Sequence, residues 1–211
     1  MTSKNDSGSS APILGAAQQL FLASGYDGLD LDLVGKAAGV SRQTVYNQFG
    51  SKEAIFRAMV QRHWDTIHFE AASSFAIQTE MATDPAHVLR HFATTLLRFV
   101  TETDQVAFTR LVIAESRRLP WIAAEFYRAG KEPILKAFAG ALALMTEKGL
   151  IRCTYPELAA DQFMGLLQEF ITWPRVMAID EAAAADLPPT NSIIEEAISM
   201  FLARYARPAT R

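Results

Sequence analysis

Apolar residues recur three and four positions apart along most of the chain, a spacing that places them on one face of an α-helix. Ile13, Ala17, Leu20 and Phe21 form the first such stripe, and Gly25 follows it. No run of alternating apolar and polar residues is long enough to predict a sheet. The pattern therefore predicts an all-α fold.

Prolines and aspartates mark where several later helices should begin, because proline is tolerated in the first helical turn and aspartate caps it. These expected starts are Asp84-Pro85, Asp104, Pro120 and Pro133. Two more stripes lie near the carboxyl end. The first, over residues 156–180, predicts a helix that Pro174 kinks or breaks. The second, over residues 194–205, predicts a final helix with a spacing close to that of coiled coils.

A glycine turn joins two short helical patterns early in the chain. Asp30 can cap the first helix and Ser41 the second, while Gly39 lacks the Cβ that would oppose the positive φ of a helix end. Two capped helices of about two turns with such a turn between them predict a helix-turn-helix. Ser51 can cap a third helix that carries Lys52 in its first turn.

The second of these helices predicts a surface that reads DNA. Val45 and Phe49 are four residues apart and can point inward together, which leaves the polar side chains outward. Arginine and amide side chains can form paired hydrogen bonds with base edges in the major groove, and hydroxyl groups suit phosphates. A lysine at a helix start is a further phosphate anchor. The predicted DNA-binding residues are Ser41, Arg42, Gln43, Thr44, Tyr46, Asn47 and Lys52.

The string AAGVSRQTVYNQFGSKEAIF closely resembles the DNA-binding domain of the TetR family of bacterial transcriptional repressors. Its most specific parts are the AGVS turn, the T-x-Y-x-x-F recognition helix and the S-K-E-A-I-F segment. The resemblance spans roughly residues 13–60, and the strings LVIAESRR and EFYRAGKEPIL resemble the ligand-binding half of the AefR-like subgroup. Gly35 stands where the family usually has alanine, which weakens the first helix by about 1 kcal/mol.

The resemblance implies an N-terminal three-helix DNA-binding domain over residues 11–58 and a larger C-terminal helical domain over residues 59–211 for ligand binding and dimerisation. Residues 1–10, rich in serine, are expected to be a disordered tail. A double-stranded DNA operator with two half-sites calls for a homodimer. In this family the last two long helices pair with their symmetry mates. The expected dimer residues are Phe163, Leu167, Ile194, Ile198, Phe201 and Tyr205, for which core packing is the alternative.

The larger domain is rich in aromatic residues, most of which must form its core. A subset could line a pocket among the helices, where helical bundles often bind ligands. The resemblance implies that such a pocket holds a small, apolar effector. The residues expected to line it are Phe92, Leu96, Phe108, Leu111, Trp121, Phe126, Phe170 and Trp173.

The charge of the chain modifies the prediction of DNA binding but does not overturn it. The whole chain carries a net charge of −3, and residues 1–60 hold five lysines and arginines against five acidic residues. DNA binding must therefore depend on placed contacts rather than on a general positive field. The single cysteine, Cys153, excludes an intramolecular disulfide and suggests a reducing, cytoplasmic setting. The longest apolar run, residues 137–145, is too short to span a membrane, so no membrane partner is expected.

No catalytic constellation, cofactor motif or metal site is expected. His87 and His91 are four residues apart, but no third ligand has a suitable spacing. The charged residues Glu115, Arg117, Arg118 and Glu125 surround Pro120, and a solvated or salt-bridged surface is the favoured interpretation over a polar ligand anchor. A helical protein that binds small molecules but has little DNA affinity remains the alternative function, and a helical enzyme is disfavoured.

Overall fold

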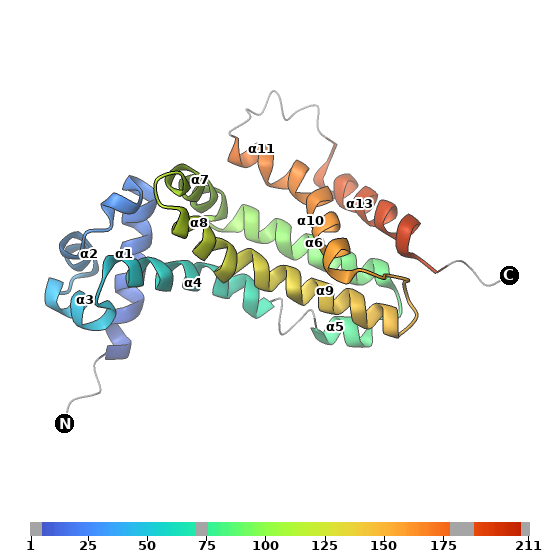
Figure 1. Cartoon of the computed structure of the whole chain (residues 1–211), viewed down its shortest axis with the longest axis horizontal. Helices are drawn as coiled ribbons and strands as arrows, with labels where there is room; N and C mark the ends of the chain where they lie inside the picture. The colour runs from blue at the N-terminus through green and yellow to red at the C-terminus, as the bar shows by residue number, and fades with distance from the viewer. Residues whose placement is uncertain (1–5, 71–75, 178–187, 208–211) are drawn as a thin grey trace. The chain divides into compact units, whose positions relative to one another are not determined.

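The computed structural model describes residues 6–70, 76–177 and 188–207, which are almost entirely helical (Figure 1). Within these ranges there is no strand, and one isolated antiparallel bridge joins Ile151 to Ala206. The all-α prediction is therefore confirmed. Residues 1–5 of the expected tail lie outside the described ranges, and the remainder of that tail is helical because α1 begins at Asp6.

Helices and short helical turns follow one another along the described ranges. The first five elements are α1 (Asp6–Ser24), the 3-10 turn η1 (Tyr26–Gly28), α2 (Leu31–Ala38), α3 (Arg42–Phe49) and α4 (Lys52–Glu70). Next come α5 (Ala76–Met81), α6 (Pro85–Glu102), α7 (Gln105–Ser116), α8 (Pro120–Phe126) and the π-helical turn η3 (Tyr127–Lys131). The last are α9 (Glu132–Glu147), α10 (Pro156–Ile171), α11 (Trp173–Val176) and α13 (Thr190–Tyr205). None of the helices in the described ranges combines the length and apolar character that a bilayer crossing requires.

The chain divides into two compact units. The first unit contains Met1–Thr66 and Arg110–Gly130, and the second contains Ile67–Thr109 and Lys131–Arg211. This differs from the contiguous division at residue 58 that the sequence suggested. The C-terminal half of α7, together with α8, packs as part of the N-terminal unit, and the boundaries fall inside α4, α7 and η3.

The predicted helix starts agree with the structure. Asp84 accepts a hydrogen bond from the amide of Ala86, and proline occupies the first turn of α6, α8 and α9. The predicted break near Pro174 is also present, since α10 ends at Ile171 and the short α11 begins at Trp173. These starts could be predicted because capping and proline placement depend on neighbouring residues only.

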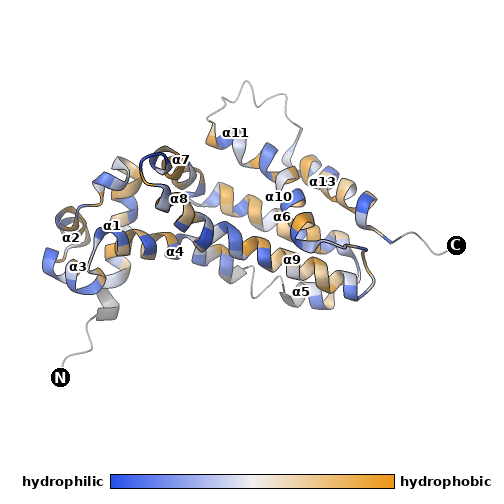
Figure 2. Ribbon diagram, in the orientation of Figure 1, coloured by the Kyte–Doolittle hydropathy of each residue, from blue (hydrophilic) through white to orange (hydrophobic). Residues whose placement is uncertain are grey.

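The first unit has a core formed by α1, α2, α3 and α4. Phe21 and Phe56 are fully buried and meet edge to face with ring centroids 5.2 Å apart. Val34 of α2 and Val45 of α3 are also fully buried, so each helix of the pair contributes to this core. The alternation of these apolar residues with polar ones leaves one face of α3 in solvent. Figure 2 shows α3 mostly in hydrophilic colours.

The second unit has an aromatic core contributed by α6, α9, α10 and α13. The rings of Phe92 and Phe138 stack with centroids 4.0 Å apart, and Phe163 lies 5.5 Å from Phe138. Phe201 meets Phe163 edge to face at 5.3 Å, which extends the cluster to the last helix. Arg90 of α6 also forms a two-pronged ion pair with Glu195 of α13. This packing holds four helices around one core.

Candidate nucleic-acid interface

The helix-turn-helix forms as predicted. The Asp30 carboxylate accepts hydrogen bonds from the amides of Asp32 and Leu33 at 2.8 and 3.1 Å, and the Ser41 hydroxyl accepts one from Thr44 at 3.0 Å. Gly39 ends α2 with a φ of 70°, the left-handed conformation for which glycine is favoured. These local contacts fix the direction in which α3 leaves the turn.

Gly35 has a structural reason for lacking a side chain. The amide of Val40 donates a hydrogen bond to the Gly35 carbonyl at 2.9 Å, which brings the turn back against α2. A Cβ on Gly35 would lie 3.0 Å from the carbonyl oxygen of Val40. The glycine thus has a low helix propensity, but it allows the backbone of the turn to approach the backbone of α2. The helix pattern alone did not show this contact.

The outer face of α3 carries the side chains expected to read DNA. Arg42, Gln43, Tyr46 and Asn47 are exposed, whereas Val45 is fully buried beneath them. Phe49 and Thr44 are half-buried, so Phe49 closes the inner face less completely than predicted. Tyr46 keeps 55% of its surface in solvent, so much of this aromatic side chain is accessible to a partner. The face is polar, continuous and unobstructed by other parts of the first unit.

The two amides of this face are linked to each other. Gln43 Nε2 donates a hydrogen bond to Asn47 Oδ1 at 2.7 Å, one helical turn away. Gln43 keeps its carbonyl oxygen and a second N–H, and Asn47 keeps both N–H groups, for other partners. This bond restrains both side chains before any partner arrives, and it leaves donors and an acceptor of the kind that base edges require.

The cations of the helix-turn-helix differ in how far they are neutralised. Lys36 pairs with Asp32 of the same helix at 2.7 Å, and both side chains are well exposed. Arg42 is exposed at the start of α3 and has no recorded ion pair within the described ranges. Arg42 is therefore the cation of α3 that an incoming nucleic acid can use without displacing a carboxylate.

Lys52, in the first turn of α4, lies against the turn between α1 and α2. Its Nζ is 4.4 Å from the centroid of the Tyr26 ring and 4.0 Å from Oδ1 of Asp27. Burial, with a smaller effect of the nearby Glu53 carboxylate, raises the pKa of the Tyr26 phenol. The ring is therefore neutral at physiological pH, and its face attracts a cation. The predicted phosphate anchor is held by a cation–π contact and a long ion pair.

Residues 110–130 complete the surroundings of this lysine within the first unit. Glu115 accepts a hydrogen bond from the Tyr26 amide at 2.9 Å, and Arg118 pairs with Asp27 at 3.1 Å. The Trp121 ring meets the rings of Tyr26 and Phe56 edge to face, at 5.4 and 5.3 Å. The turn that supports Lys52 is thus bound to α7 and α8 by both polar and aromatic contacts.

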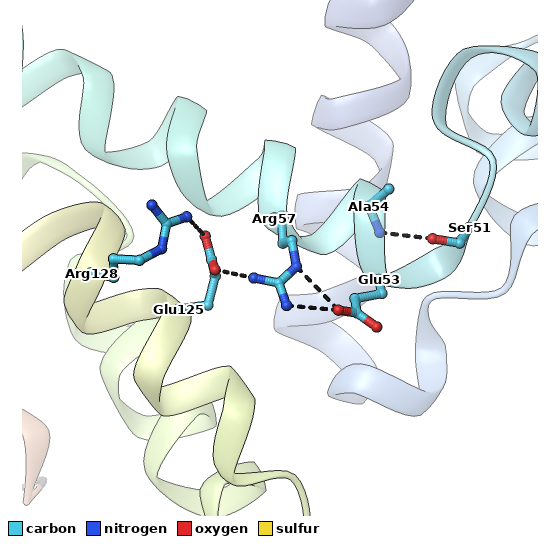
Figure 3. A network of polar contacts seen from close by, with 6 residues as sticks. All are labelled: Ser51, Glu53, Ala54, Arg57, Glu125 and Arg128. Carbon is cyan, nitrogen blue, oxygen red and sulfur yellow. Dashed lines mark hydrogen bonds and ion pairs between the residues drawn. The ribbon is translucent and has the colours of Figure 1, made fainter.

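A second link joins α4 to α8 through a buried carboxylate (Figure 3). The Glu125 side chain is only 3% exposed and accepts hydrogen bonds from Arg57 and Arg128. Arg57 also binds Glu53, with its Nη2 2.7 Å from Oε1, and stacks near the Trp121 ring. Two guanidinium groups satisfy a carboxylate that could not remain buried alone.

The next helical turn of α4 is packed just as closely. Trp64 lies beside Phe126, with ring centroids 5.0 Å apart, and against Gly130 in the π-helical turn. A Cβ added to Gly130 would overlap the indole ring. Wide π turns such as η3 are uncommon in helices and often lie at functional positions. Here the turn brings a residue without a side chain against the buried face of α4.

The charged cluster around Pro120 is salt-bridged, as the favoured interpretation allowed, but not all of it lies on the surface. Glu125 is buried and Glu115 is mostly covered, while Arg117 and Arg118 remain exposed. Their partners, Arg57, Tyr26 and Asp27, lie 68 to 91 positions away along the chain, which is why the sequence did not reveal them. The only available signal was the unusual concentration of charge beside a helix start.

The residues predicted to line an effector pocket are divided between the two compact units. Phe92, Leu96 and Phe108 are buried in the second unit, where Phe92 stacks on Phe138. Phe170 and Trp173 belong to the same unit but are 40% and 42% exposed. The remaining three lie in the first unit, and two of these have the ring contacts given above: Leu111, Trp121 and Phe126. Core packing accounts for the first three, and the effector-lining role of all eight residues stays a prediction.

The residues predicted for the dimer interface need a correction. Five of them have at most 4% of their surface in solvent because they form the core between α10, α13 and the neighbouring helices: Phe163, Leu167, Ile194, Ile198 and Phe201. Tyr205 is half-buried against Phe201, with ring centroids 4.6 Å apart. The stripe predicted from the sequence is therefore the inward face of each helix, and these five residues pack in the core of the second unit.

Burial also characterises the single cysteine. Cys153 is buried, and this burial raises the pKa of its thiol. A neutral, covered thiol reacts slowly, since the thiolate is the reactive form. This environment suits a structural thiol better than a redox sensor.

The Asp30 cap predicts a pH dependence of stability. The hydrogen bonds from Leu33 and then Asp32 lower the pKa of the Asp30 carboxyl, so the cap stabilises the fold fully above the ordinary aspartate pKa. That contribution is lost as the pH falls below about 4, through the folded-state pKa. In urea unfolding at pH 7 and pH 3, Asp30→Asn should lose less stability on acidification than the wild type. Asparagine caps without titrating, so equal losses would show that Asp30 is not responsible.

Comparisons with known proteins agree with this geometry. Residues 13–59 match the family model described as bacterial regulatory proteins, tetR family, and residues 87–207 match the AefR-like transcriptional repressor, C-terminal domain. An uncharacterized HTH-type transcriptional regulator of Mycobacterium tuberculosis is 30% identical over 173 residues, which cover 81% of this chain and 78% of that protein.

Two solved structures are similar over nearly the whole length. The flavonoid-responsive regulator FrrA has a TM-score of 0.76 at 28% identity, covering 96% of this chain and all of that one. A TetR family transcriptional regulator from Pseudomonas syringae pv. tomato has a TM-score of 0.72 at 25% identity, covering 99% of this chain and all of that one. The likeness extends across both compact units.

Proposed function

Because the chain belongs to the tetR family of bacterial regulatory proteins, we propose that this transcriptional regulator is a ligand-responsive repressor. It binds a palindromic operator as a homodimer and is released by a small apolar effector. The observation that carries the proposal is the outer face of α3, where Arg42, Gln43, Tyr46 and Asn47 are exposed together on a capped helix. The match to a repressor C-terminal domain supports the sign of the response.

The DNA contacts divide by chemistry. The arginine and the amides of α3 suit base edges, and hydroxyl groups together with Lys52 suit phosphates. The equal numbers of acidic and basic residues between residues 1 and 60 give this surface little general attraction for DNA. Affinity therefore depends on a few contacts in register, and its salt dependence should be modest.

A second copy of the chain is proposed to cover the outer face of α10 and α13. This face carries the exposed apolar side chains of Phe170 and Met200. Phe170 and Met200 also line an apolar groove of about 210 Å³ that runs between the two helices. In a twofold-symmetric dimer both copies contribute the same groove, so each of these apolar residues becomes buried in both copies.

Charging this face is expected to separate the dimer. Phe170→Asp places a carboxylate in the proposed interface of both copies, and loss of such central apolar contacts often costs 2 kcal/mol or more, which is roughly a thirtyfold weaker dimer. Sedimentation equilibrium measures the change. Ile113→Asp is the matched control, because Ile113 is equally an exposed apolar residue but belongs to α7. A Phe170→Asp protein that remains as dimeric as the Ile113→Asp protein would contradict this interface.

Release by an effector requires differential affinity. A ligand shifts the protein away from DNA only if it binds more tightly to a conformation in which the two recognition helices do not match the operator. The α4 helix, which begins with Lys52 and contains a unit boundary, is the proposed lever. The name of FrrA describes that regulator as flavonoid-responsive, which makes flavonoids sensible first probes here.

Fluorescence anisotropy of a labelled bound duplex tests regulated release. A flavonoid that is an effector should weaken DNA binding by about 5- to 150-fold, the usual range of allosteric coupling, and DNA should weaken flavonoid binding by the same factor. A fatty acid serves as an aliphatic ligand in the same titration. A ligand that binds while DNA affinity stays constant would exclude it as an effector. Ligand binding without any DNA affinity would support the alternative of a small-molecule-binding protein.

A further inference from the structure

Asp27 lies between two cations that come from different parts of the first unit. Its Oδ2 is 3.1 Å from Nη2 of Arg118, near the end of α7, and its Oδ1 is 4.0 Å from Nζ of Lys52 at the start of α4. The closer partner is Arg118, and the distance to Lys52 is too long for a hydrogen bond. One carboxylate is thus shared unequally by an arginine and by the predicted phosphate anchor.

The turn that carries Asp27 is also held by contacts other than its own ion pairs with the two cations. Glu115 accepts a hydrogen bond from the Tyr26 amide, and the Tyr26 ring packs between Phe56 and Trp121. Gly25 has a φ of 67°, and a Cβ there would lie 2.5 Å from the Glu115 carboxylate. Because the backbone is fixed at this turn, Asp27 stays beside Lys52 whichever cation it pairs with.

We propose that Asp27 and Arg118 are positioning residues that set how readily Lys52 binds a DNA phosphate. Arg118 engages the Asp27 carboxylate and leaves the Lys52 ammonium group on the Tyr26 ring, from which it can reach a phosphate. Without Arg118, the carboxylate pairs with Lys52 and competes with DNA for it. The inference rests on the proposed DNA-binding function and adds to it two residues outside the helix-turn-helix.

The chemistry of the three groups supports this division of roles. A lysine ammonium is a compact charge with three donors, so a neighbouring carboxylate and a phosphate compete for the same group. An arginine guanidinium has five donors and binds one carboxylate with less loss of freedom. Arg118 also binds Glu115 at 2.9 Å, which keeps it at the turn. It is therefore well placed to engage the Asp27 carboxylate more closely than Lys52 does.

A set of variants in a duplex-binding titration tests the proposal. Arg118→Gln should weaken binding by about two- to fivefold and Asp27→Asn should strengthen it by a similar factor, the range for exposed ion pairs. In the Asp27→Asn background, Arg118→Gln should have no further effect. In the Lys52→Met background, neither change should matter. Asp65→Asn is the control, because it removes a negative charge from an exposed position on α4. Any effect that it has on DNA affinity should be the same in the Lys52→Met background.

Additive effects in these backgrounds would overturn the proposal. They would mean that Asp27 and Arg118 act on DNA through their own charges rather than through Lys52. Tighter DNA binding by the Arg118→Gln protein would also overturn the proposal, because it would show that the freed Asp27 carboxylate does not compete with DNA for Lys52. Circular dichroism of every variant confirms that each remains folded before its affinity is compared.

A measurement without DNA separates this inference from the proposed function. Lysine acylation of the free protein, read by mass spectrometry, reports on Lys52 relative to Lys36, which pairs with Asp32. Arg118→Gln should slow labelling of Lys52 and Asp27→Asn should accelerate it, each by about twofold or more, because a carboxylate disfavours the reactive neutral amine. Labelling that neither variant changes would reject the arrangement even if DNA binds. A wild-type protein that enriches no duplex would reject the function, while the labelling still decides the arrangement.

Discussion

Arg42→Ala should lower operator affinity by about ten- to a hundredfold, because a two-pronged arginine contact with a base contributes roughly 1–3 kcal/mol. Arg42 is the exposed cation of α3 and has no recorded carboxylate partner within the described ranges, so nothing has to be displaced before it binds. The loss should be greatest for the preferred sequence and smaller for unrelated duplexes. Fluorescence anisotropy at two salt concentrations, with both kinds of duplex, measures it.

Arg117→Ala is the matched control for this change. Arg117 is also an exposed arginine of the first unit, but it lies at the end of α7 and outside the helix-turn-helix. Its loss removes the same charge and should alter affinity by less than about threefold, the effect of a weak surface charge. Equal losses for the two variants would show that Arg42 contributes general charge and reads no base.

Gly130→Ala should destabilise the fold by about 1–3 kcal/mol, the usual cost of overfilling a packed site. The new Cβ would overlap the indole ring of Trp64, which is 4% exposed and cannot turn away into solvent. The ring or the π-helical turn must move, and both belong to the contact between α4 and η3 in the first unit. Thermal unfolding should show a loss of about 2–4 °C for each kcal/mol in a chain of this size.

The same substitution at Gly140 should have the opposite effect on the stability of the fold. Gly140 lies within α9, and a Cβ there would have no neighbour within 4 Å. Alanine should therefore stabilise that helix by up to about 1 kcal/mol through its higher helix propensity. Since both changes gain propensity, their difference isolates the clash with Trp64. Two variants that are equally stable would mean that η3 adapts freely and does not constrain α4.

The helix-turn-helix could be predicted in detail because its determinants are local. Asp30, Ser41 and Gly39 act on groups within a few residues, and the structure confirms each of these contacts. The exposed face of α3 follows from helical periodicity once Val45 is known to be buried. Where a cap or turn residue is well matched to its neighbours, little else is needed to define the element.

Contacts between distant segments could not be predicted from the same patterns. Arg57 and Glu125 are 68 positions apart, and nothing near either residue indicates the other. The first unit therefore includes residues 110–130, which the sequence assigned to the larger domain. The charged residues around Pro120 appeared to be a surface because charge alone does not distinguish a solvated carboxylate from one buried between two arginines.

The apolar stripes of the last helices illustrate a different limit. Phe163 and Ile198 recur at helical spacing, yet that spacing identifies the most buried face, which here is the core of the second unit. Phe170 and Met200 are exposed apolar side chains of the same two helices. For a helix with apolar residues on both faces, periodicity cannot decide which face meets a partner.

Selection of random duplex DNA by the purified protein, followed by sequencing, tests the central claim most directly. The account predicts enrichment of a palindrome whose half-sites are about one helical turn, or a multiple of it, apart, because two recognition helices related by twofold symmetry must reach the same face of DNA. The Arg42→Ala protein should not enrich it. No enriched sequence from a stable dimer would contradict the account and leave ligand binding as the function of the chain.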